Sequence, residues 1–184
     1  MGDNKEILQP SEVKAQGILT SKGVKVKEKD CIDALSQRGY GTTEKSGLML
    51  TFYESLLLVD KQVLNVKDKK GTPADFQRLL NEYAAVEENA WIMYMVYRDL
   101  RSRGYVVREG IGAAINFRIY ERGTYGKDTA ASLVVSMQEG QPLSLEDLSK
   151  ALTQAQSLKK ELVLAVLNRR GEIVYYSVSP LTFK

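Results

Sequence analysis

The order of short apolar segments in the second half of the chain is the feature that most constrains its fold. An amphipathic helix is predicted over 144–158, where Ser144 can cap the first turn and leucines recur at three- and four-residue spacing. From residue 105 onward, every other apolar segment is short and strand-like. These segments are 105–110, 113–122, 131–137, 161–168 and 172–178. Strands interrupted by a helix predict an α/β (α+β) fold, with a central mixed sheet flanked by helices.

The first half of the sequence predicts a smaller unit that also mixes strands and helices. Asp30 is placed to cap a helix that Gly39 ends. Thr51 and Glu54 have the spacing of a capping box, in which each side chain satisfies an amide at the start of a helix, here 51–60. Further segments are strands at 15–27 and 62–67 and a helix at 73–88.

A long helix over 90–104 is expected to open the second unit. We therefore predict two domains, a small α/β domain at 1–88 and a larger α/β domain at 89–184. No Gly/Ser-rich linker separates them, so we expect them to touch. Within the helix, Trp91, Tyr94 and Tyr97 recur at helical spacing, which predicts that they pack in the core.

The composition indicates a packed protein without a membrane span. Hydrophobic residues make up 43% of the chain and charged residues 27%, which is ordinary globular composition. No run of about 18 apolar residues occurs, and the first residues are too polar for a signal peptide, so we expect a cytoplasmic protein. The chain has one cysteine and no histidine, which argues against zinc catalysis and against Ser-His or Cys-His triads. We expect no metal and no cofactor.

Basic residues gather in one part of the second half. Between positions 98 and 127 the sequence has seven Lys or Arg against three acidic residues. This clustering is a stronger indication of a polyanionic partner such as RNA than the small net charge of +3 is. A solvated rim of mixed charge explains the same pattern equally well.

One strand and one helix end carry side chains of the kinds that take part in catalysis. Alternation along the strand places Phe117 and Ile119 on one face and Asn116, Arg118 and Tyr120 on the other. A tyrosine on a strand often serves packing alone, and a lysine such as Lys160, between a helix and a strand, is usually solvated. In one cleft, however, a tyrosine can take the proton of an RNA 2′-hydroxyl and a lysine can stabilise the pentacoordinate phosphate.

These segments, in this order, resemble a known family. The run "VYRDLRSRGYVVREGIGAAINFRIYERG" and the later "AQSLKKELVLAVLNRRGEIVYYSV" look like the C-terminal nuclease domain of archaeal tRNA-splicing endonucleases. The earlier "LTFYESLLLVDKQVLNVKDKKG" looks like the smaller N-terminal domain of that family. The resemblance implies metal-independent cleavage of precursor tRNA at a bulge-helix-bulge, which leaves a 2′,3′-cyclic phosphate and a 5′-hydroxyl.

The resemblance also implies site residues. The general-base tyrosine of the family falls on Tyr120, and its catalytic lysine falls on Lys160, which follows Lys159. The general-acid histidine falls on Thr129, whose hydroxyl is a poor proton donor near neutral pH. Basic residues around Tyr120 are the candidates for RNA contact, namely Arg118, Arg122 and Lys127.

Other positions depart from the family as well. Asn116 replaces an acidic residue, Thr153 stands where an RNA-gripping arginine is expected, and the loop "NRRGE" is basic where the family loop is often acidic. We therefore expect the non-catalytic subunit of a heterotetramer, in which two such chains pair with two catalytic subunits around precursor tRNA. Two alternatives remain open: an active endonuclease with a replaced general acid, and a free-standing module that binds RNA or protein. The terminal strand is expected to extend its sheet across a subunit interface.

Overall fold

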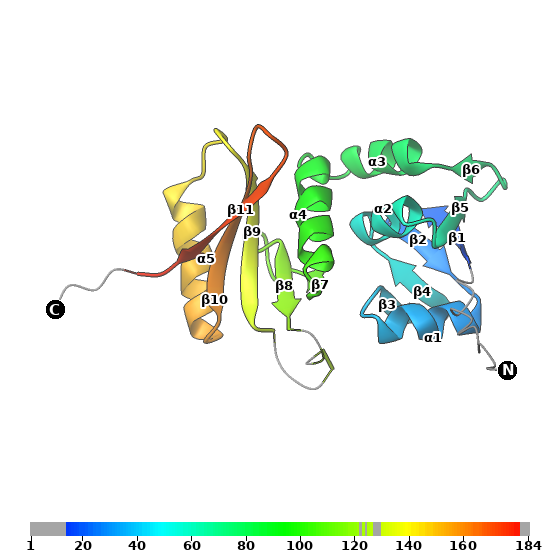
Figure 1. Ribbon diagram of the computed structural model, residues 1–184, viewed down its shortest axis with the longest axis horizontal. Helices are drawn as coiled ribbons and strands as arrows, with labels where there is room; N and C mark the ends of the chain where they lie inside the picture. Colours follow the sequence, from blue (N-terminus) through cyan, green and yellow to red (C-terminus); the bar gives the residue numbers. More distant parts are fainter. Residues whose placement is uncertain (1–13, 122, 124, 127–129, 181–184) are drawn as a thin grey trace, which may run out of the picture.

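The computed structural model describes residues 14–121, 123, 125–126 and 130–180 of the 184-residue chain. Two separate sheets lie along the long axis of the molecule, with helices between them (Figure 1). The fold is therefore the expected α+β class, with a mixed sheet in each half. No helix within the described ranges is long and apolar enough to cross a membrane.

The N-terminal sheet has the strand order β3-β4-β2-β1-β5-β6. Its only parallel pair joins β1 to β5, and the other described pairs are antiparallel. Its elements are β1 (Ala15–Thr20), β2 (Gly23–Val26), α1 (Lys29–Gln37), β3 (Thr42–Glu44), β4 (Gly47–Leu50), α2 (Phe52–Asp60), β5 (Leu64–Lys67), β6 (Pro73–Ala74) and α3 (Phe76–Ala84).

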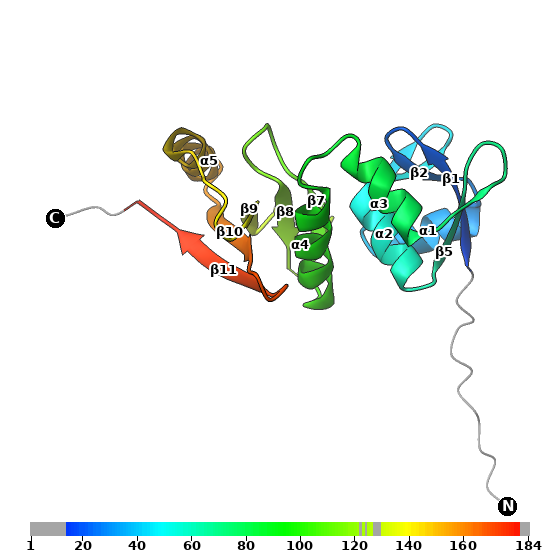
Figure 2. The ribbon, with the colours of Figure 1, turned by 90° about the horizontal axis from the view of Figure 1, so that it is seen from above.

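The C-terminal sheet has the order β11-β10-β9-β8-β7, and β9 and β10 are its parallel pair. Its elements are α4 (Ala90–Ser102), β7 (Val106–Glu109), β8 (Phe117–Tyr120), β9 (Ser132–Gln138), α5 (Leu145–Ser157), β10 (Glu161–Leu167) and β11 (Ile173–Val178). The helix α4 covers one face of the sheet and α5 the other (Figure 2). β11 lies at the outer edge, and its residues are half-buried or exposed.

The expected caps are correct for two helices and wrong for one, and a further helix begins later than expected. Thr51 and Glu54 form the capping box of α2, and Ser144 accepts hydrogen bonds at the start of α5. The residue that precedes α1 is Glu28, not Asp30, since the helix begins at Lys29. The third predicted helix begins at Phe76 instead of residue 73 because Asp75 caps it, and the proline before it pairs in β6.

Two strand expectations also need correction. The hairpin β3–β4 was not expected, because β3 is short, polar and fully exposed. The predicted strand at 113–122 is reduced to β8, since residues before Phe117 form a tight loop. In that loop the Gly110 amide donates to the Asn116 carbonyl at 2.9 Å. The backbones are so close that a Cβ on Gly110 would meet the Ile115 carbonyl oxygen at 1.7 Å, so only glycine fits there.

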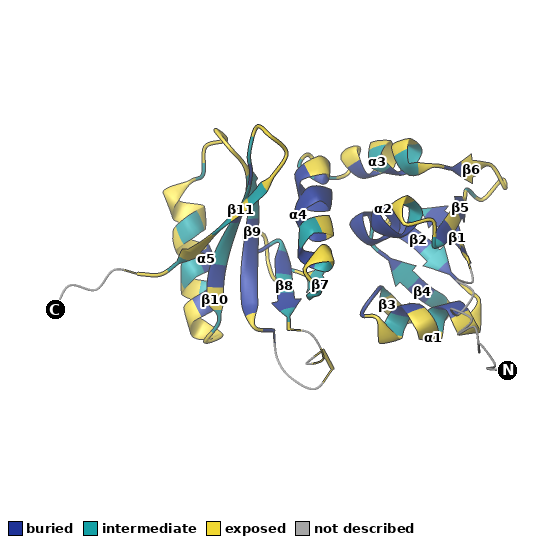
Figure 3. Ribbon diagram, in the orientation of Figure 1, coloured by how far each residue is buried: buried dark blue, intermediate teal, exposed yellow. Residues whose placement is uncertain are grey.

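An aromatic cluster joins the two halves of the protein. The ring of Tyr53 on α2 lies 4.7 Å from Tyr97 on α4 and 5.3 Å from Phe117 on β8, measured between centroids. Buried residues run without a break from the C-terminal sheet through α4 into α2 (Figure 3). Tyr94 and Tyr97 are buried as predicted, but Trp91 is 46% exposed, so the core expectation was wrong for Trp91. The two halves touch, as expected.

Candidate functional site

The register of the C-terminal sheet brings Tyr120 and Lys160 to the same edge. Ile119 of β8 pairs with Ser132 of β9, which pairs in turn with Glu161 of β10. Tyr120 follows Ile119 and Lys160 precedes Glu161, and both steps lead toward the same end of the sheet. The two backbones are separated by two strand spacings, or about 10 Å. We call this end, with Tyr120 and Lys160, the reaction edge.

Both residues belong to the face of the sheet that α5 covers. Phe117 and Ile119 are buried in the core that includes α4, so Arg118 and Tyr120 lie on the opposite face. Leu162 belongs to the core beneath α5, and Lys160 lies two positions before it. The alternation predicted for 116–120 is therefore correct, and it places a phenol and an ammonium group on one side.

The C-terminus of α5 fixes the backbone of Lys160. The Lys159 amide donates to the Gln156 carbonyl at 3.0 Å, and the Lys160 amide donates to the Ala155 carbonyl at 2.9 Å. This pair of hydrogen bonds is a Schellman motif, which needs a left-handed residue after the helix. Lys159 takes that role with φ of 55°, although glycine is usual there. The end of α5 thus fixes the backbone position of Lys160 at the reaction edge.

Tyr120 contacts a second tyrosine, which the sequence pattern did not reveal. The rings of Tyr120 and Tyr125 meet edge to face, with centroids 5.2 Å apart and planes at 82°. The guanidinium of Arg108 lies 5.8 Å from the centroid of the Tyr125 ring. Tyr125 lies two residues after Gly123, in a stretch without periodic hydrophobicity, so no sequence signal marked it. We call Tyr120 and Tyr125 the aromatic corner.

The N-terminal half of the protein holds Arg108 in place. Its Nη1 donates to the Gly39 carbonyl at 3.2 Å and to Glu54 Oε1 at 3.3 Å, and its Nη2 donates to Thr42 Oγ1 at 3.0 Å. Glu54 is only 2% exposed, and it also accepts from the Gly41 amide at 3.0 Å. Burial raises the pKa of Glu54, while its amide donors and Arg108 oppose that shift.

The structure describes one of the three residues that were predicted to contact RNA. Arg118 pairs directly opposite Arg108 in the β7–β8 ladder, and its Nε donates to the Glu109 carbonyl at 2.9 Å. Arg122, Lys127 and Thr129 lie outside the described residues. Only Arg118 can therefore be placed, on the same face of β8 as Tyr120.

Part of the basic cluster makes contacts within the protein. Arg101 donates to the Arg38 carbonyl at 2.9 Å and lies 4.1 Å from the centroid of the Tyr40 ring. Arg103 pairs with Asp99 at the end of α4 and lies 5.2 Å from the centroid of the Tyr175 ring on β11. Together with Arg108, these residues join elements of the fold, so the excess of cations at 98–127 is not simply a surface for a polyanion.

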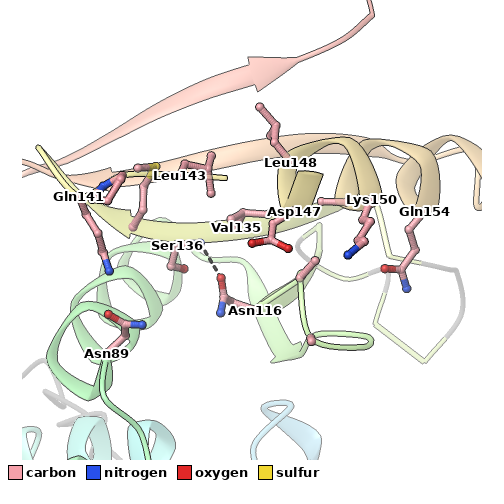
Figure 4. Close-up of a pocket in the computed structure, with 15 residues that line it drawn as sticks. Asn89, Asn116, Val135, Ser136, Gln141, Leu143, Asp147, Leu148, Lys150 and Gln154 are labelled. Carbon is pink, nitrogen blue, oxygen red and sulfur yellow. Dashed lines mark hydrogen bonds between the residues drawn. The ribbon is translucent and has the colours of Figure 1, made fainter. Parts of the chain in front are cut away.

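A cleft of about 540 Å³ opens at the other end of the α5 face (Figure 4). Asn116 lines it and accepts a hydrogen bond from the Ser136 amide at 2.7 Å. Asp147 and Lys150 of α5 line its other side, whereas neither Tyr120 nor Lys160 reaches it. Asn116 thus holds the loop between β7 and β8 against β9.

Within the described part of the chain, acidic and cysteine side chains form no group suited to a metal ion.

Comparison with known proteins gives consistent matches in both halves. Residues 90–175 match the family model of the tRNA intron endonuclease catalytic C-terminal domain, and residues 15–80 match its N-terminal domain. The tRNA-splicing endonuclease of Methanococcus vannielii is 32% identical over 163 residues, which cover 89% of this chain and 92% of that protein. The Pyrococcus horikoshii tRNA-splicing endonuclease is 31% identical over 157 residues, 85% of this chain and 90% of that one. This chain therefore belongs to the tRNA intron endonuclease family.

Proposed function

We propose that this chain is the structural subunit of a tRNA-splicing endonuclease, and that it leaves cleavage to a companion chain. One observation carries the proposal: the sequence contains no histidine, although Tyr120 and Lys160 share one edge of the sheet. A tyrosine and a lysine can remove the 2′-hydroxyl proton and stabilise the charged phosphate. With those two roles taken, no imidazole remains to supply the proton that the departing 5′-oxygen needs near neutral pH.

The reaction in which the subunit takes part follows from the family resemblance. Precursor tRNA is cut at a bulge-helix-bulge without a metal ion, and the ends are a 2′,3′-cyclic phosphate and a 5′-hydroxyl. Loss of a general acid lowers such a rate on the order of 100- to 10,000-fold. Thr129 stands at the position that corresponds to the acid. This cytoplasmic chain therefore binds RNA and holds the two catalytic subunits apart, while the partner subunits cleave the RNA.

The assembly we propose is an α2β2 heterotetramer. One RNA carries two cleavage sites at a fixed separation, so two active chains need a rigid spacer. The terminal strand β11 supports this role, since it pairs with β10 on one side and exposes 54% of Tyr176 and 37% of Val174. An edge strand with exposed apolar side chains is suited to extend its sheet into a second subunit.

The test separates this proposal from an active endonuclease. The purified chain is incubated alone with a bulge-helix-bulge RNA, and the products are analysed for cyclic-phosphate ends. We expect no efficient cleavage. Cleavage by the chain alone at a rate comparable with that of an active family member would overturn the proposal, because another group would then supply the proton.

A second experiment separates the proposal from a free-standing binding module. This chain is co-expressed with a histidine-bearing catalytic chain, and the native mass and composition of the complex are measured. We expect equal numbers of the two chains and cleavage activity in the mixed complex. Failure of the two chains to associate under gentle conditions would favour the module.

A further inference from the structure

The aromatic corner lies at the reaction edge, yet proton transfer needs only one of its two tyrosines. Tyr125 is 37% exposed, and Tyr120 is half-buried beside it. Their edge-to-face contact, with planes at 82°, uses the edge of one ring and one face of the other. A planar group can therefore stack on a remaining face and meet the second ring at its side.

A chain of contacts supports the position of this corner in the free protein. Buried Glu54 holds Arg108, Arg108 lies 5.8 Å from the centroid of Tyr125, and the Tyr125 ring meets Tyr120. The backbone of Tyr120 belongs to β8, which pairs on both sides with β7 and β9. Pre-organised rings lose little conformational entropy on binding, so stacking on them is more favourable than on mobile side chains.

We propose that the aromatic corner binds one unpaired nucleobase of an RNA strand by stacking, and this inference rests on the proposed function. Every nucleobase presents a π-face, so aromatic side chains bind unpaired bases with little sequence preference. In this chain Tyr120 would then act as a binding surface for RNA together with Tyr125, whether or not its hydroxyl takes part in chemistry.

The charges around the corner favour a nucleotide over an apolar peptide side chain. Arg118 lies on the same face of β8 as Tyr120, two residues away, or about 7 Å along the strand. Arg108 lies directly opposite Arg118 across the ladder, and Lys160 is at the same edge of the sheet. Arg108 is paired with Glu54. The positive charge near the corner therefore comes from Arg118 and Lys160. These cations attract the phosphate that is attached to a stacked base.

The inference is tested by RNA binding to the full-length chain. The probe is a bulge-helix-bulge RNA, and a second RNA has abasic sites in place of its bulge bases. We expect Tyr125→Leu to weaken binding of the first RNA about tenfold, the value for loss of one base stack. The same substitution should change binding of the abasic RNA much less, and Tyr125→Phe should retain the wild-type affinity for both.

Trp91→Leu is the matched control, because it removes an exposed aromatic ring beside Gln138 and Glu139, at the opposite end of β9 from the aromatic corner. We expect it to leave RNA affinity unchanged. Wild-type affinity in Tyr125→Leu, or an equal loss for both RNAs, would overturn the inference and leave the proposed function standing. Weaker assembly with the catalytic chain at unchanged RNA affinity would mean a protein contact and would also overturn it. Absence of RNA binding by both the chain and the complex would overturn the proposed function itself.

Discussion

Arg108 and Glu54 form an ion pair across the two halves of the protein, with 3.3 Å between Nη1 and Oε1 and with Glu54 almost fully buried. Glu54 also completes the capping box of α2. The same carboxylate thus stabilises the start of a helix in the N-terminal half and binds Arg108 of the C-terminal sheet. Beyond Arg108 lie Tyr125 and the reaction edge. The position of the candidate site thus depends on a residue that is far from it in sequence.

Removal of Arg108, whose side chain is only 15% exposed, should destabilise the protein. Arg108→Leu leaves the Glu54 carboxylate buried without its cationic partner, and we expect a loss of about 3 kcal/mol in the free energy of unfolding. Arg108→Leu combined with Glu54→Gln should recover part of this loss, since the uncompensated charge is gone. Urea denaturation of the two variants measures the difference. Equal losses in both would show that the buried charge is not the cause.

The pH dependence of stability gives a second test of Glu54. Burial raises the pKa of Glu54 in the folded state above its ordinary value of 4.5. Between the unfolded and the folded pKa, the folded protein binds more protons, so this residue's contribution to stability is largest at low pH and falls as pH rises. The stability of Glu54→Gln relative to the wild type should therefore rise as pH increases above about 4.5. A difference that does not vary with pH would contradict the shift.

Local signals predicted much of the fold, and tertiary contacts explain the failures. The capping box at Thr51 and Glu54 depends on residues three apart, so sequence spacing was sufficient. The β3–β4 hairpin has no comparable signal, because its polar first strand is held by pairing with β4. Residues 113–116 have strand-like side chains, but the close approach of Gly110 to Ile115 turns the backbone there.

The C-terminus of α5 contains a strained residue whose replacement should stabilise the protein. Lys159 has φ of 55°, a conformation that disfavours every residue with a Cβ. Lys159→Gly should raise the free energy of unfolding by about 0.5–1 kcal/mol, after the greater entropy of glycine in the unfolded chain is included. Lys159→Ala is the control, because it removes the charge and keeps the strain. Equal effects of the two substitutions in thermal denaturation would argue against backbone strain.

Restoration of a general acid should confer some cleavage activity on the isolated chain. Thr129→His puts an imidazole at the position that the family resemblance implies for the general acid, and general acids contribute on the order of 100- to 10,000-fold in rate. We expect measurable cleavage of a bulge-helix-bulge RNA, with cyclic-phosphate ends, below the rate of an active family member. Thr129→His with Lys160→Met is the control and should be inactive. Activity that survives loss of Lys160 would show that the reaction edge is not the catalytic site.

The residues of the reaction edge were only partly predictable from the sequence. Tyr120 and Lys160 were named from family resemblance, and the pairing of β8, β9 and β10 brings them to one edge. Tyr125 and Arg108 were missed as neighbours of Tyr120, because a loop tyrosine and an interdomain arginine carry no periodic signal. Such contacts between distant segments depend on the packing of the two halves.

The exposed side chains of β11 give the last prediction. If β11 joins subunits, a charge at its exposed apolar positions should weaken assembly, because burial of an unpaired charge in an interface is unfavourable. Val174→Lys with Tyr176→Lys should lower the native mass of the co-expressed complex and leave the stability of the free chain nearly unchanged. Tyr175→Phe is the control, since Tyr175 instead faces α4 and donates to Asp99 at 2.7 Å. It should reduce stability by about 1 kcal/mol without dissociating the complex. A complex that keeps its mass despite both lysines would exclude β11 as the subunit interface.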